Sequence, residues 1–154
     1  MNKDILKRLN DEDWNSNKSS NRPRVWVNGT FDVIHRGHVE LMNFAAQYGD
    51  VRVGIDLDSR VKELKGEDRP VNNWEDRTYV ISNLKAVHSV VGFDSDETLI
   101  ECIKDWKPGV MIVGSDYKNK RVIGSEYAGK LVFFDRIEGY SSTNIINHAS
   151  SSIR

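Results

Sequence analysis

Between residues 24 and 148 the sequence alternates short apolar runs with longer amphipathic segments, and this alternation restricts the fold more than any other feature. The apolar runs are typical of strands, whereas the segments between them repeat apolar residues at helical spacing, as Leu41, Met42, Ala45 and Ala46 do. The predicted strands are 24–28, 51–57, 88–93, 109–114 and 130–134, and the predicted helices are 37–48, 73–85, 96–106 and one that begins near Ser142. Such alternation predicts an α/β fold with a doubly wound, parallel, five-stranded sheet and helices on both faces.

The ends of the chain differ in composition from this regular part. Residues 1–22 are polar and poor in aliphatic side chains, which predicts a flexible N-terminal arm. We expect one domain over 23–148 and a short C-terminal tail over 149–154. No internal repeat or second linker interrupts the domain.

Composition excludes several classes of protein. The formal net charge is −1, so there is no basic excess of the kind that general nucleic-acid or membrane-surface binders carry. The single cysteine, Cys102, cannot form an intramolecular disulfide or a multi-cysteine zinc site. The sequence shows no apolar run of about 18 residues and no segment like a signal peptide. We therefore expect a cytoplasmic protein without a nucleic-acid or membrane partner, in which any anionic ligand is bound by local geometry.

The segment "GTFDVIHRGH" (29–38) has the strongest functional signal, because it follows the first predicted strand and leads into a helix. Ligands of parallel α/β sheets bind at the carboxyl ends of the strands, which is where this segment lies. We expect Gly29 and Gly37 to let a ligand approach the backbone closely. The free N–H groups and dipole of the following helix favour an anion. His35 and His38, three residues apart on its first turn, can donate hydrogen bonds to one phosphoryl group.

A purely structural role or a zinc site would account for the histidine pair less well in this context. A pair at this spacing is often structural, and two histidines without a nearby thiolate form an incomplete zinc ligand set. The chain has neither a GxGxxG fingerprint nor a GxxxxGK[ST] loop. A histidine pair between a strand and a helix suits nucleotidyl transfer, which requires positioning and stabilisation of charge on the α-phosphate.

At these residues the sequence resembles the cytidylyltransferase-like nucleotidyltransferases, whose HxGH motif matches His35 to His38. Further matching segments are "LKGEDRPVNNWEDR" (64–77), "VGSDYKNKRVIGSE" (113–126) and "RIEGYSSTNII" (136–146), so that the resemblance covers 25–146. It is strongest to members that adenylylate D-glycero-β-D-manno-heptose 1-phosphate, and it extends to glycerol-3-phosphate cytidylyltransferases. It implies a Rossmann-like fold.

The resemblance also implies roles for single residues on the first half of the domain. The imidazoles of His35 and His38 would bind the triphosphate and stabilise the transition state. The backbone of Thr30 and Phe31 would lie beside the nucleotide. Lys65, in the predicted loop after the second strand, would bind phosphates or the acceptor, although a purely solubilising role is the alternative because Arg60 and Lys62 are in the same loop. Arg77 would bind phosphate with its guanidinium group, although an ion pair with a neighbouring acidic residue is the alternative.

The second half supplies the other predicted binding residues. Ser142 and Thr143 are expected to cap the last helix and to form an anion site there. Gly139 would allow the chain to turn, and Arg136 would add a positive charge. Asp116, after the fourth strand, would bind the ribose or order its loop.

The implied reaction transfers a nucleoside monophosphate from ATP or CTP to a phosphorylated sugar or polyol. The body of the chain favours the heptose type, whereas "RIEGYSST" is more like the CTP-using members, so the base stays open. The family implies Mg²⁺ with the nucleotide, held mainly by the triphosphate and not by a protein metal site, and commonly a homodimer. Glycerol-3-phosphate cytidylyl transfer is one alternative, and a non-catalytic nucleotide sensor is another.

Overall fold

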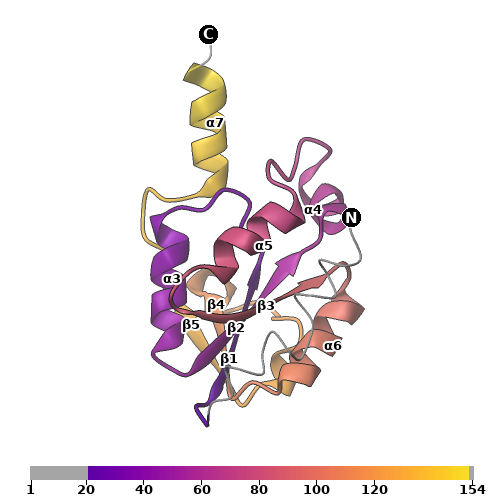
Figure 1. The fold of residues 1–154 in the computed structure, drawn as a ribbon, viewed down its shortest axis with the longest axis vertical. Coiled ribbons are helices and arrows are strands. Elements are labelled where there is room, and N and C mark those ends of the chain that lie inside the picture. Colours follow the sequence, from indigo (N-terminus) through magenta and orange to yellow (C-terminus); the bar gives the residue numbers. More distant parts are fainter. Residues whose placement is uncertain (1–20, 153–154) are drawn as a thin grey trace.

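Five parallel strands form one sheet in the order β3-β2-β1-β4-β5, as seen in the computed structural model, which describes residues 21–152 (Figure 1). The strands are β1 (Arg24–Gly29), β2 (Asp50–Asp56), β3 (Val87–Phe93), β4 (Val110–Gly114) and β5 (Lys130–Phe134). The helices are α3 (Arg36–Ala46), α4 (Asp58–Lys65), α5 (Trp74–Ser82), α6 (Asp96–Trp106) and α7 (Ser142–Ser152), with short 3-10 turns η2 (Ser115–Tyr117) and η3 (Ser125–Tyr127). The predicted doubly wound α/β fold is confirmed.

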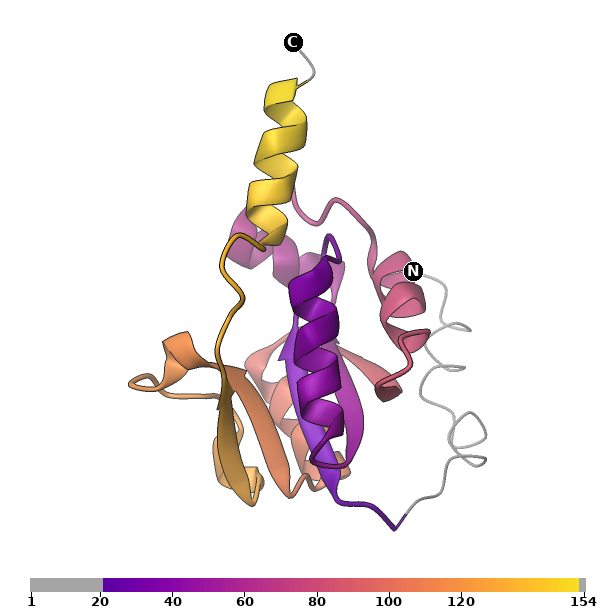
Figure 2. The same ribbon diagram turned by 90° about the vertical axis from the view of Figure 1, so that its left-hand side faces the viewer.

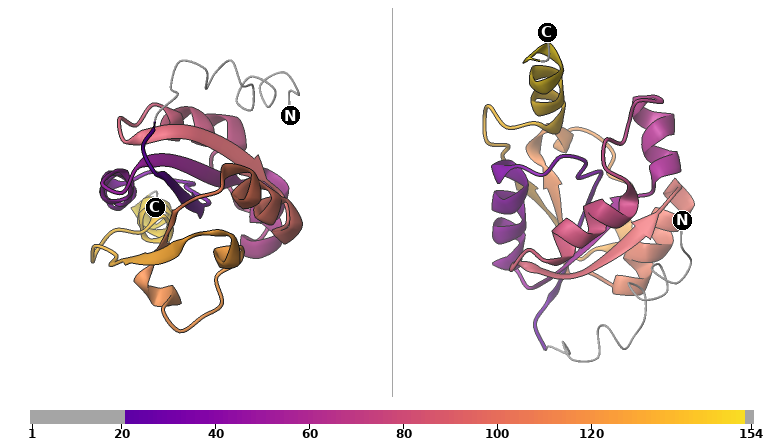
Figure 3. Two further views of the ribbon diagram at one scale, coloured as in Figure 1. Left: turned by 90° about the horizontal axis from the view of Figure 1, so that it is seen from below. Right: turned by 45° about the horizontal axis from the view of Figure 1, so that its top comes forward.

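The strands place apolar side chains alternately on the two faces of the sheet. Val25 and Val27 of β1 join the core under α3 and α5, whereas Trp26 between them packs with α6 on the opposite face. Trp74 of α5 and Ile103 of α6 are fully buried in these two layers. Figure 2 and the left view of Figure 3 show the helices on both sides of the sheet. This two-sided burial explains why the strands read as nearly continuous apolar runs.

The strand order fixes where a ligand can bind. The chain builds the sheet outward from β1 to β3, then returns to add β4 and β5 on the other side of β1. The loops after β1 and β4 therefore diverge at the carboxyl edge, which opens a crevice between them. Helix α7 rises from this edge, away from the body of the domain (Figures 1 and 2).

Several predicted boundaries were wrong. Residues 58–65, predicted as a loop, form α4, in which only Val61 is buried, so that it has too little apolar periodicity to be recognised. Helix α5 ends at Ser82, and its N-cap is Asn73, whose side chain accepts a hydrogen bond from the Asp76 backbone. The helix thus begins one residue after the predicted start at residue 73 and ends three residues before the predicted end at residue 85. Helix α7 extends to Ser152, so the first part of the predicted tail is helical.

The predicted arm over 1–22 lies almost entirely outside the described residues, as do the last two residues of the chain. Within residues 21–152, none of the helices has the length and apolar character that crossing a bilayer would need.

Candidate active site

A cleft of about 540 Å³ opens at the carboxyl edge of the sheet. The loop after β1 forms its floor, and the loops after β2, β4 and β5 contribute its walls. The wall includes these predicted site residues: Gly29, Thr30, Phe31, His35, Gly37, His38, Lys65, Arg136, Ser142 and Thr143. Asp116, Arg77 and Gly139 are not part of it.

His35 and His38 hold the start of α3 together. His35 is the N-cap residue, and its Nδ1 accepts a hydrogen bond from the backbone N–H of Gly37 at 3.0 Å. The Nδ1 of His38 accepts one from the backbone N–H of His35 at 3.2 Å. The two rings stack with centroids 3.9 Å apart. The pair thus forms a reciprocal capping box, built from imidazoles instead of the usual hydroxyl and carboxyl groups.

These contacts fix the tautomer of both rings. A ring nitrogen that accepts a backbone hydrogen bond carries no proton, so each neutral ring carries its proton on Nε2. Burial lowers the pKa of His38 to about 4, with smaller contributions from the neighbouring imidazole, Arg136 and Lys65. Burial also lowers the pKa of His35. Near neutral pH, therefore, both rings are uncharged and each has one Nε2–H group available to a ligand.

The two glycines of the motif leave space for neighbouring aromatic rings. A Cβ on Gly37 would lie 2.8 Å from Cε1 of His35, and a Cβ on Gly29 would lie 3.1 Å from the Phe31 ring. Both glycines thus make room for the protein's own rings, which line the cleft. Phe31 has a positive φ of 51° and packs edge-on against His38, with centroids 5.3 Å apart.

Three basic side chains approach the cleft from the side of β2. Arg60 is paired with Asp56 at 2.9 Å and with Asp96 at 2.7 Å. Lys65 ends α4 at the rim, where partial desolvation lowers its pKa and the charge of Arg69 lowers it further. Burial raises the pKa of Asp56, although Arg60 opposes this shift.

Asp32 anchors this side of the cleft to the histidine loop. Its buried carboxylate accepts hydrogen bonds from Nε of Arg69 at 2.8 Å and from the backbone N–H groups of Val71 and Asn72, each at 2.9 Å. Burial alone would raise the pKa of Asp32, but these three donors outweigh it and lower the pKa. The Asn72 side-chain amide also donates to the Asp32 carbonyl at 2.7 Å.

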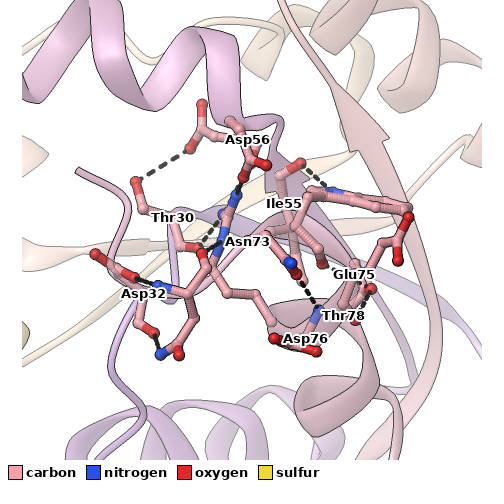
Figure 4. A network of polar contacts seen from close by, with 12 residues as sticks. Thr30, Asp32, Ile55, Asp56, Asn73, Glu75, Asp76 and Thr78 are labelled. Carbon is pink, nitrogen blue, oxygen red and sulfur yellow. Dashed lines mark hydrogen bonds and ion pairs between the residues drawn. The ribbon is translucent and has the colours of Figure 1, made fainter. Parts of the chain in front are cut away.

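Arg77 does not reach the cleft, so its predicted contact with phosphate is not supported by the structure. Its side chain is fully buried, and Nη1 donates to the carbonyls of Thr30 and Asp56, each at 2.8 Å. Nε donates to the Asn72 carbonyl, and Nη2 pairs with Asp58 at 2.7 Å. Figure 4 shows Thr30 and Asp56 side by side in this network, joined also by the Thr30 hydroxyl at 3.4 Å. Arg77 therefore positions the turns after β1 and β2.

The opposite wall comes from β4, β5 and the start of α7. Arg136 is 70% exposed and forms an ion pair with Asp116 at 3.5 Å, so Asp116 lies beside the cleft and orients one of its cations. Gly139 has a φ of +84°, which accounts for the turn there. The Tyr140 ring lies parallel to His35, with centroids 6.0 Å apart.

The cap of α7 is Ser141 and not Ser142. The Ser141 hydroxyl accepts a hydrogen bond from the backbone N–H of Asn144 at 3.0 Å. Ser142 donates its hydroxyl to the Val33 carbonyl at 2.6 Å, which ties the helix start to the histidine loop. Thr143 is exposed and lies in the cleft wall. The N-terminus of α7 therefore borders the cleft, as predicted, with a different capping residue.

Counting the described residues, the wall carries five basic side chains (Arg or Lys) against two acidic ones, although the whole chain has a formal net charge of −1. Wall residues that the sequence did not single out include Asn28, Asp32, Asp56, Arg69, Arg121 and Tyr140. Asp32 lies just after β1 and Asp56 is the last residue of β2, so both are at the carboxyl ends of neighbouring strands, which is a signal that could have indicated them. In the described part of the chain, no three His, Cys, Asp or Glu side chains are grouped as a metal site would need.

Comparison with known proteins identifies relatives of this chain. Residues 26–148 match the model of the family described as Cytidylyltransferase-like. The chain is 46% identical over 123 residues to the bifunctional protein HldE of Aliarcobacter butzleri, and 43% identical over 129 residues to that of Helicobacter hepaticus. These alignments cover 79% and 83% of this chain but only 26% and 27% of the relatives, so the chain spans about a quarter of their length.

Solved structures show the same fold. A lipopolysaccharide core biosynthesis protein of Thermoplasma volcanium aligns with a TM-score of 0.58 at 24% identity, covering 77% of this chain and 98% of that one. A pantothenate synthetase of Thermus thermophilus aligns with a TM-score of 0.57 at 14% identity, covering 82% of this chain and 62% of that one. The family match extends from β1 into α7 and includes the histidine pair. The chain belongs to the cytidylyltransferase-like family of nucleotidyltransferases.

Proposed function

We propose that this protein transfers a nucleoside monophosphate from ATP or CTP to a phosphorylated sugar, of the heptose 1-phosphate type, and releases pyrophosphate. The observation that carries the proposal is the pair of neutral imidazoles, each with its Nε2–H free for a ligand in a cleft of net positive charge. The similarity to the HldE proteins, together with the sequence resemblance to heptose 1-phosphate adenylyltransferases, supports the acceptor class.

The chemistry requires no covalent enzyme intermediate. An oxygen of the acceptor's phosphate attacks the α-phosphorus, a new P–O bond forms, and the bond to the β-phosphate oxygen breaks as pyrophosphate leaves with the electron pair. Negative charge builds on the equatorial oxygens of the α-phosphate. His35 and His38 donate to these oxygens from Nε2, and fixed donors of this kind contribute roughly 3–4 kcal/mol each.

The remaining wall binds the two substrates. Arg136 and the N-terminus of α7, with Ser142 and Thr143, hold the triphosphate from the β5 side. The carboxylates of Asp32 and Asp56 already pair with arginines, so Mg²⁺ would be held by the triphosphate oxygens and would neutralise part of their charge. We also propose that the enzyme acts in the cytoplasm as a homodimer.

Pyrophosphate release tests the proposal. ATP, CTP, GTP and UTP are each combined with heptose 1-phosphate or glycerol 3-phosphate, with Mg²⁺ present throughout. We expect one nucleotide with heptose 1-phosphate to give turnover that His38→Ala abolishes. Turnover with glycerol 3-phosphate and CTP alone would favour the polyol alternative. Nucleotide binding without pyrophosphate from any pair would contradict transfer and favour a sensor.

A further inference from the structure

The cationic side chains of the cleft form two groups on either side of the histidine loop. Because β1 is the central strand, the loop after β2 borders the histidines on one side and the loops after β4 and β5 border them on the other. Arg60, Lys65 and Arg69 belong to the β2 side, whereas Arg121 and Arg136 belong to the β4 and β5 side. A reaction between two phosphorylated substrates needs two such anion sites, one on each side of the α-phosphorus.

The three cations of the β2 side differ in how much of their charge is already compensated. Arg60 pairs with both Asp56 and Asp96, so its guanidinium is engaged by two carboxylates. Among the described residues, Arg69 forms an ion pair with Asp32 alone, through Nε. Nε of Arg60 is also buried without a well-aligned hydrogen bond, but it lies 2.9 Å from the Asp56 carboxylate. Arg60 therefore serves the protein's own acidic groups, whereas Arg69 retains Nη2 for another partner.

Arg69 carries an orphaned donor in a rigid setting. Its side chain lies in the cleft wall and is only 13% exposed. Its Nη2 atom is buried and has no hydrogen-bond partner among the described residues. A buried guanidinium donor without a partner is costly, and native structures seldom leave one unused. The carboxylate that orients it, Asp32, is itself held by two backbone N–H groups, so that the guanidinium cannot easily turn to solvent.

We propose that Arg69, with Lys65 beside it, binds the phosphomonoester of the acceptor substrate and selects for phosphorylated acceptors. This inference rests on the proposed function for the identity of the acceptor. In the proposed function the triphosphate is held from the β5 side, and in-line displacement requires the attacking oxygen to approach from the side opposite the leaving pyrophosphate. The β2 side is therefore the acceptor's side. An arginine fork matches the tetrahedral oxygens of a phosphate, and Asp32 positions that fork.

Steady-state kinetics of Arg69→Gln tests this assignment against a matched control, Lys62→Gln. Lys62 lies on the same helix as Lys65 but is exposed and outside the cleft wall. With heptose 1-phosphate as the acceptor, we expect Arg69→Gln to raise the KM for the acceptor about 10- to 100-fold, as loss of a charge-assisted hydrogen bond implies. The KM for the nucleotide stays within about twofold, and Arg69→Lys gives an intermediate value. Lys62→Gln changes neither KM.

A binding measurement separates this inference from the proposed function. Inorganic phosphate is titrated into each variant saturated with a non-hydrolysable nucleotide analogue, and thermal unfolding confirms that the variants fold. Weaker phosphate binding in Arg69→Gln supports the anion site even if no sugar phosphate is turned over. If Arg69→Gln raised the KM for nucleotide as much as that for acceptor, or left the KM values and phosphate binding unchanged, the assignment would be wrong.

Discussion

The Nδ1 atom of His38 accepts a hydrogen bond from the backbone N–H of His35 at 3.2 Å, and the two imidazoles stack with centroids 3.9 Å apart. One pair of side chains thus performs two tasks. The Nδ1 atoms begin a helix, and the Nε2–H groups remain for the substrate. A substitution that replaces the Nδ1 acceptor but not the Nε2–H donor should therefore separate the effect on stability from the effect on activity.

His35→Asn is expected to preserve the fold and remove activity. Asparagine is a good N-cap residue, so its side-chain oxygen can accept from Gly37 in place of Nδ1, and the free energy of unfolding should change by less than about 0.5 kcal/mol. His35→Ala should cost about 1 kcal/mol. Both variants lose the Nε2–H donor, and kcat should fall about 10²- to 10³-fold. Chemical denaturation and pyrophosphate release measure the two effects, and equal activity of His35→Asn and the wild type would refute the donor role.

The pH dependence of stability should report the lowered pKa of His38. Its pKa is about 4 in the folded protein against 6.5 for an ordinary histidine. The unfolded chain therefore binds a proton at this residue that the folded protein does not, and stability is lost as the pH falls from about 6.5 toward 4. Above pH 6.5 this contribution is fully present and constant.

Denaturant titrations of the wild type and His38→Asn between pH 4 and 8 measure this loss. Because His35, whose pKa is also lowered, contributes in the same direction, the slope should shrink in the variant without vanishing. An identical pH slope in both proteins would show that His38 does not titrate in this way.

Arg77→Gln should destabilise the fold without a selective effect on either substrate. The change leaves the carbonyls of Thr30 and Asp56 without their donor, and loss of one partner from a buried ionic network costs about 3–5 kcal/mol. Arg36→Gln serves as the control, because that side chain is 68% exposed and its one ion pair within residues 21–152 is with Glu40. This change should cost less than about 0.5 kcal/mol. If Arg77→Gln were as stable as the wild type and raised the KM for the nucleotide but not for the acceptor, Arg77 would bind phosphate after all.

Gly37→Ala should disturb the histidine pair. Its Cβ would lie 2.8 Å from Cε1 of His35, so the ring must move and the alignment of the donors is lost. We expect kcat to fall at least about tenfold, since fixed donors of this kind are worth more than that factor. Gly109→Ala is the matched control, because its Cβ would meet only the Arg24 carbonyl at 3.9 Å. If both variants retained full kcat, the alignment of the rings would not matter.

Local patterns made the fold and the motif predictable. The strands were recognisable because both faces of the sheet are buried, and helix α6 was predicted with its observed bounds because Leu99, Ile103 and Trp106 mark one apolar face. Helix α4 was missed because Val61 is its only buried residue. Ser142 was predicted to cap α7, but Ser141 does so. The two residues are adjacent and of the same type, so the sequence could not distinguish them.

Non-local contacts limited what the sequence could predict about the site. An arginine near the start of a helix, such as Arg77, is equally suited to a ligand phosphate or to backbone carbonyls. Only the fold brings Thr30 and Asp56 next to its guanidinium. Asp32 is similar, because its donors lie 37 to 40 residues away in the chain. The partners of Arg77 and Asp32 depend on tertiary structure, so the sequence alone could not identify them.

Phosphorus NMR of the reaction mixture tests the central claim most directly, because it shows which bond is made. The protein is incubated with Mg²⁺, heptose 1-phosphate and either ATP or CTP. We predict a new diphosphate ester and pyrophosphate in equal amounts with one of the two nucleotides, and neither product with His38→Ala. A nucleoside diphosphate with a bisphosphorylated sugar, or free nucleoside monophosphate without the ester, would contradict nucleotidyl transfer at this cleft.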